Sequence, residues 1–185
     1  TPGVTKPKII ELPSKNYSDI GSLAVADIDG DGNLDVFVAG QSVPGRFPEA
    51  ASSWLLRCGS AGLELDKKQS STFANVGMVT AAVFAQLDSD PFPELVIATE
   101  WGPIRIFKNN AGTFTAGTKE WGLDQKLGLW QTLAAGDFNN DGNTDFAIPS
   151  SASQTLTVLF GDSKEGVGSK KFFPVGMGPT WVTKT

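Results

Sequence analysis

Short runs of alternating apolar and polar residues, separated by turns rich in glycine, proline, asparagine and aspartate, extend along most of the chain. A period of two residues is typical of strands with one buried face. The 3.6-residue period of an amphipathic helix is hard to find anywhere. The pattern therefore predicts an all-β protein.

The predicted strands recur in three copies of one unit, each built around an acidic loop. The loop segments ADIDGDGNLDVFVA (26–39), AQLDSDPFPELVIA (85–98) and GDFNNDGNTDFAIP (136–149) align without a gap. In each copy an apolar strand precedes the loop and another follows it, and two further strands with a glycine-containing turn complete the unit. The repeat interval is in or slightly above the range of a four-stranded propeller blade.

We therefore expect a β-propeller segment of three four-stranded antiparallel blades, with a calcium loop between the first two strands of each. The blades are expected over about residues 20–67, 78–117 and 129–176, and 8–13 and 179–185 are interpreted as strands of neighbouring blades. Because propellers have about four to eight blades, three cannot close a ring. We expect residues 1–185 to form one propeller segment, completed by further blades of a longer chain or by self-association.

The loops have the residue pattern of a hard-cation site. Oxygen-bearing side chains alternate along a loop that curls at a glycine, and Ca²⁺ accepts about 6–8 oxygen ligands in a flexible shell. In the first loop the expected ligands are the side chains of Asp27, Asp29, Asp31 and Asp35, with the carbonyl of Asn33. In the third loop they are the side chains of Asp137, Asn139, Asp141 and Asp145, with the carbonyl of Asn143.

The second loop departs from this pattern. It retains Asp88, Asp90 and Glu94, but Gln86 stands first and Pro91 replaces the turn glycine, so it is predicted to bind metal weakly or not at all. An EF-hand is excluded, because the twelfth positions of the two complete loops are apolar and lie in predicted strands. The alternative for all three loops is a set of solvated turns without metal.

Composition removes several classes of function. The chain has no histidine, which excludes Ser-His-Asp catalysis and histidine-ligated metals. Its net charge of −5 and pI of about 4.7 argue against nucleic acid as a partner, because phosphate binding needs a basic face. No apolar run is long enough to predict a membrane span.

The chain resembles the FG-GAP/VCBS repeats of integrin-alpha-like propellers, and among these the bacterial proteins linked to the ASPIC/UnbV group. The resemblance rests on the loops and on the stretches VPGRFPEAASSWLLR (43–57), ATEWGPIRIFKN (98–109) and GLWQTLAAGDFNNDGNTD (128–145). It implies a propeller with calcium in the loops, an extracytoplasmic setting and no established common activity.

These observations predict a non-enzymatic, calcium-binding scaffold of a secreted, periplasmic or cell-surface protein, which binds a protein or glycan ligand. One alternative is a lectin-like propeller with sugar sites between blades. Another is a hydrolase or lyase that uses a metal-bound water, which requires an open coordination position facing a pocket.

Overall fold

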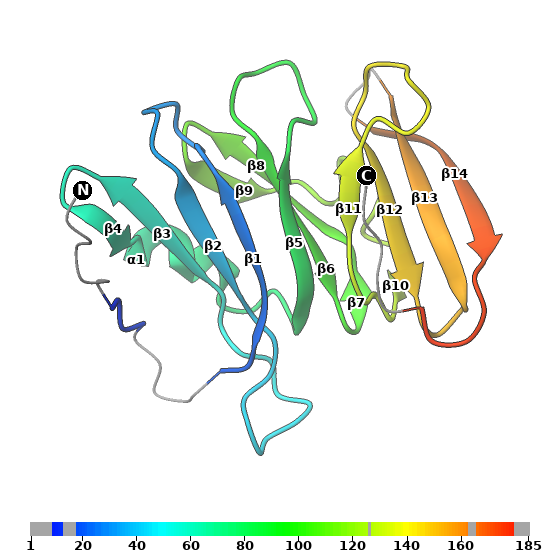
Figure 1. The fold of residues 1–185 in the computed structure, drawn as a ribbon, viewed down its shortest axis with the longest axis horizontal. Coiled ribbons are helices and arrows are strands. Elements are labelled where there is room, and N and C mark those ends of the chain that lie inside the picture. The colour runs from blue at the N-terminus through cyan, green and yellow to red at the C-terminus, as the bar shows by residue number, and fades with distance from the viewer. Residues whose placement is uncertain (1–8, 13–17, 126, 163–165, 180–185) are drawn as a thin grey trace, which may run out of the picture.

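The computed structural model describes residues 9–12, 18–125, 127–162 and 166–179, and it contains three four-stranded antiparallel sheets. Figure 1 shows them side by side in chain order. The first sheet comprises β1 (Ile20–Ala26), β2 (Asp35–Gly40), β3 (Trp54–Gly59) and β4 (Gly62–Leu65). The second comprises β5 (Val79–Ala85), β6 (Glu94–Thr99), β8 (Arg105–Asn110) and β9 (Thr113–Ala116). The third comprises β11 (Ala134–Gly136), β12 (Asp145–Ser150), β13 (Thr155–Asp162) and β14 (Gly166–Pro174).

This arrangement confirms the predicted all-β, propeller-type fold, and the described residues form no closed ring. A two-stranded ribbon of β7 (Gly102–Pro103) and β10 (Leu127–Gly128) completes the strands. No helix in the described part of the chain is long and apolar enough to cross a membrane.

One short helical segment departs from the all-strand expectation. Helix α1 (Lys67–Ser70) and the 3-10 turn η1 (Ser71–Phe73) connect the first sheet to the second. The carboxylate of Asp66 accepts the amide hydrogen of Gln69 at 2.9 Å, which caps the first turn. Four helical residues are too few to show a period in the sequence.

The segment 8–13, predicted as a strand of a neighbouring blade, is only partly described. Residues 9–12 form no strand, because none of the described strands pairs with them. Of the predicted strand 179–185, residues 180–185 lie outside the described part of the chain.

Two apolar cores hold the three sheets together. Ala24 and Phe37 of the first sheet pack against Leu95 and Phe107 of the second, while the opposite face of the second sheet packs against Phe146 and its neighbours in the third. The central strand β6 is buried along its whole length because it lies between both cores. Sheet-on-sheet packing of this kind aligns successive repeats, so their equivalent loops reach the same edge.

Figure 1 shows this common edge at the top of the molecule, where the β1–β2, β5–β6 and β11–β12 connections project together. We call residues 27–35, 86–94 and 137–145 the first, second and third loops. The three candidate metal-binding loops therefore lie along one edge of the molecule.

Candidate metal centre

The first loop brings three of its predicted ligands together. One carboxylate oxygen from each of Asp27, Asp29 and Asp35 lies within 4.8 Å of the others. Asp31 is not part of this group, and its Oδ1 accepts the amide hydrogen of Asn33 at 2.7 Å. That hydrogen bond lowers the pKa of Asp31. Three converging carboxylates fit a hard divalent cation such as Ca²⁺.

The backbone of the first loop curls around Asp27. Its two carboxylate oxygens accept the amide hydrogens of Gly30 and Gly32 at 2.8 and 2.9 Å. Both glycines have left-handed backbones, with φ of 78° and 85°. A glycine adopts this conformation without the steric cost that other residues incur, which explains the glycines of the motif.

The ninth residue of each loop is buried and ties the loop to its sheet. Asp35 accepts the amide of Ile28 within the loop and the amide of Cys58 on β3, at 3.3 and 2.8 Å. Asp145 makes the same pair of bonds with Phe138 and Gly161, at 2.7 and 2.9 Å. Burial raises the pKa of Asp35, and the two amides oppose that rise. Asp35 and Asp145 each connect three backbone segments: the start of the loop, the strand that follows the loop, and the next strand of the sheet.

The second loop also gathers a carboxylate cluster, made of Asp88, Asp90 and Glu94. Glu94 is fully buried, and its Oε2 accepts the amide of Leu87 at 2.9 Å. Its Oε1 is buried without a hydrogen-bond partner among the described residues. Burial raises the pKa of Glu94 to about 7, and the negative charge of Asp88 adds to the rise. A buried acceptor without a donor is costly, and a cation would satisfy it.

The two departures of the second loop compensate each other. In the first loop the amide of Gly32 bonds to Asp27, but Pro91 at the equivalent position has no N–H to donate. Gln86, which replaces the aspartate, instead donates its Nε2 hydrogens to the carbonyls of Asp88 and Asp90. The side-chain amide of Gln86 thus holds the loop backbone in its curled conformation, and the three acidic side chains still converge.

The third loop repeats the curl of the first loop and has an asparagine, Asn139, at the position of Asp29. Asp137 accepts the amide of Gly142 at 2.9 Å, as Asp27 does in the first loop. The Nδ2 of Asn139 donates to Asp141 at 2.7 Å, and the amide of Asn143 lowers the pKa of Asp141. Within the described chain, only the first and second loops bring three acidic side chains within 4.8 Å. The ligand set of the third loop stays a prediction.

Side chains outside the acidic pattern connect the loops to one another. Asn109 on β8 donates to the carbonyl of Ile28 in the first loop at 2.8 Å, and Thr144 donates to the carbonyl of Gln86 at 2.8 Å. Arg57 on β3 contacts Asp29 at 2.7 Å. Sequence reasoning missed all three residues, because nothing in their local pattern distinguishes them from ordinary strand and turn residues.

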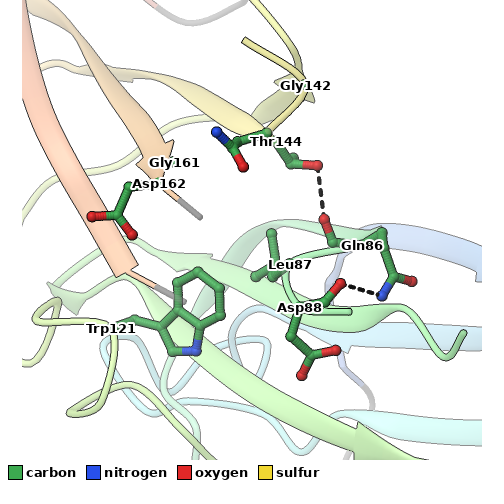
Figure 2. Close-up of a pocket in the computed structure, with 9 residues that line it drawn as sticks. Gln86, Leu87, Asp88, Trp121, Gly142, Thr144, Gly161 and Asp162 are labelled. Atoms are coloured by element: carbon green, nitrogen blue, oxygen red, sulfur yellow. Dashed lines mark hydrogen bonds between the residues drawn. The ribbon is translucent and has the colours of Figure 1, made fainter. Parts of the chain in front are cut away.

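A pocket of about 180 Å³ lies between the second and third loops. Figure 2 shows Gln86, Leu87 and Asp88 on one side, Thr144 on another, and Asp162 near the ring of Trp121. The indole N–H of Trp121 is buried and finds no hydrogen-bond partner in the described chain. Two carboxylates, those of Asp88 and Asp162, line the pocket.

Comparison with known proteins gives one family match. Residues 86–148, about a third of the chain, match the family model of the FG-GAP-like repeat. The match begins at the first residue of the second loop and continues through the third loop into β12. No curated protein matches the chain. The match confirms the resemblance to FG-GAP/VCBS repeats, which are a scaffold type of unit, while the relation to the ASPIC/UnbV group stays a prediction.

Proposed function

We propose that this chain with an FG-GAP-like repeat is a calcium-binding, propeller-type interaction scaffold without catalytic activity. The observation that carries the proposal is the convergence of three carboxylates in each of the first and second loops. The buried Oε1 of Glu94, which has no hydrogen-bond partner among the described residues, also supports it, because a cation there would offset the cost of burying the carboxylate.

Calcium would act mainly on stability. A cation that binds only the folded loop stabilises the folded state by mass action, by about 2.7 kcal/mol per site at 100 times Kd. Loops of weak affinity, with Kd on the order of 10⁻⁴–10⁻³ M, fill in extracellular fluids and stay empty at cytosolic calcium. We therefore propose a secreted, periplasmic or cell-surface location.

Calcium chelation is expected to lower the melting temperature of the protein, because it removes this binding energy. Asp29→Ala should reduce the calcium response, since one of the three converging carboxylates of the first loop is lost. Differential scanning fluorimetry with and without calcium measures both effects. Asp124→Ala, outside the loops, is the control and should retain the full response. An identical melt with and without chelator would refute calcium binding as the role of the loops.

The outer faces of the end sheets are suited to contacts with other protein surfaces. On β1, Leu23 and Val25 are 60% and 52% exposed and point away from the core that buries Ala24. On β14, Phe173 is 45% exposed. In a propeller such faces are covered by adjacent sheets. We propose that further blades, from a longer chain or a second copy, pack there and complete the scaffold.

Carbohydrate binding is the second candidate function, and the pocket between the second and third loops favours it. A sugar hydroxyl can donate its hydrogen to the carboxylate of Asp88 or Asp162, which both line the pocket. The volume of about 180 Å³ suits one small ring rather than a drug-sized ligand.

A glycan array probed with the wild-type protein and with Asp162→Asn tests this alternative. The variant removes a carboxylate that lines the pocket, so glycan binding through the pocket should weaken at least about fivefold. Asp124→Asn, outside the pocket, is the matched control and should bind as the wild type does. Binding that is absent, or equal in wild type and Asp162→Asn, would exclude the pocket as a sugar site.

A further inference from the structure

The guanidinium of Arg57 joins the first loop to two other elements. Its Nη1 lies 2.7 Å from Oδ2 of Asp29, and its Nε lies 3.4 Å from Oδ2 of Asp66, the residue that caps α1. Its Nη2 donates to the carbonyl of Gly112, in the turn between β8 and β9 of the second sheet. The side chains of Arg57 and Asp29 are only 25% and 29% exposed, so solvent screens this pair less than a surface pair.

The turn at Gly112 is shaped to admit this guanidinium. Gly112 has a φ of 80°, and a Cβ atom at this position would overlap the guanidinium of Arg57. The lack of a side chain leaves space for the cation, and glycine adopts the left-handed backbone without a steric cost. Arg57 is therefore built into the contact between the first and second sheets rather than lying freely on the surface.

Among the ion pairs of the described residues, none joins the equivalent residue of either other repeat to its own loop. The segments 52–57, 103–108 and 154–160 align, which places Lys108 and Phe160 at the position of Arg57. Lys108 forms an ion pair with Glu120 at 3.1 Å, and Phe160 has no charge. The contact of Arg57 with Asp29 is thus specific to the first loop and does not follow from the repeat.

We propose that Arg57 is the resident cation of the first loop and that it sets the calcium affinity of that loop. In the metal-free protein its guanidinium neutralises Asp29, and a divalent cation entering the loop must displace it or share the carboxylate with it. Because Arg57 also bonds Gly112, calcium occupancy of the first loop is coupled to the contact between the first and second sheets. This inference rests on the calcium binding proposed above.

The proposal predicts effects of opposite sign on affinity and on metal-free stability. Arg57→Gln removes a positive charge beside the entering cation, so the calcium affinity of the first loop should rise about tenfold. The same variant should melt at a lower temperature in chelator, because it loses the bonds to Asp66 and Gly112. A purely structural arginine would lower both the stability and the affinity when it is replaced.

Isothermal titration calorimetry of wild type, Arg57→Gln, Arg57→Lys and Lys108→Gln with calcium tests the proposal. The first loop is identified as the site that Asp29→Asn removes. Arg57→Lys keeps the charge and should bind like the wild type, and Lys108→Gln should leave this site unchanged. If the wild-type loop binds no calcium, gain of an Asp29-dependent site in Arg57→Gln supports the proposal. Equal or weaker binding by Arg57→Gln, or no gained site, overturns it.

A second measurement uses only the wild-type protein, in case Arg57→Gln does not fold. The NMR signals of the Arg57 Nη hydrogens should shift during calcium titration and exchange faster with water, because the bond from Nη1 to Asp29 is weakened. An unchanged signal while the first loop fills would contradict the proposal. Calcium binding as such fails separately, when chelation leaves the melt of every variant unchanged.

Discussion

Replacing Phe73 with alanine is expected to lower the free energy of unfolding by about 3–5 kcal/mol. Phe73 lies in η1, is fully buried, and packs edge-on against three other rings of the first core. The centroid distances are 5.2 Å to Phe37, 5.1 Å to Phe107 and 5.7 Å to Phe114. Because these rings come from both the first and the second sheets, the cavity would weaken the contact between them.

Urea unfolding followed by tryptophan fluorescence measures this loss. Phe172→Ala is the matched control, since Phe172 on β14 is 56% exposed and should cost less than about 1 kcal/mol. A loss for Phe73→Ala as small as that of the control would show that η1 does not anchor the two sheets.

In calcium-free solution, stability is expected to fall by about 3 kcal/mol through Glu94 as the pH rises from 4.5 to about 7. Below pH 4.5 this carboxyl is protonated in both the folded and the unfolded chain, so its full contribution is present. Between the two values the unfolded chain releases the proton while burial keeps it bound in the folded protein, and stability is progressively lost. Above about pH 7 the loss is complete.

Chemical denaturation of the calcium-free protein across this pH range checks the effect of Glu94. Glu94→Gln should flatten the decline, because glutamine stays neutral and its carbonyl can still accept the amide of Leu87. Glu64→Gln, at an exposed position of β4, should leave the decline unchanged. Saturating calcium should also reduce the decline when the cation occupies the second loop. A pH profile unaffected by Glu94→Gln would show that this carboxyl is not held neutral.

The first loop shows how much of the candidate site the local sequence pattern predicts. The spacing of its aspartates and glycines predicts the turn, because Asp27 accepts hydrogen bonds from amides only three and five residues away. The pattern predicts Asp35 as the last ligand of the loop, and the folded chain brings one of its carboxylate oxygens within 4.8 Å of those of Asp27 and Asp29. It could not show that Asp31 turns to its neighbouring amide, since alternate spacing treats all the acidic side chains alike.

The second loop has an arrangement that the local sequence pattern does not predict. Gln86 and Pro91 break the motif, so the sequence ranks this loop below the third as a metal site. The folded chain gathers Asp88, Asp90 and Glu94 all the same, because Gln86 bonds the backbone that an aspartate would otherwise hold. Two substitutions that look independent in sequence compensate each other in space.

The sequence by itself determined the strand repeat, the all-β class and the positions of the three acidic loops, because these follow from period-two burial and short-range turn bonds. Only the tertiary structure decided which carboxylates converge, how deeply Glu94 is buried and which cation Asp29 meets. Those features depend on contacts between sheets, such as that of Arg57 with Gly112 across 55 positions of sequence. No local pattern predicts such contacts. The alternation along a strand determines on which face of the sheet a side chain lies, but not which residue of another sheet it contacts.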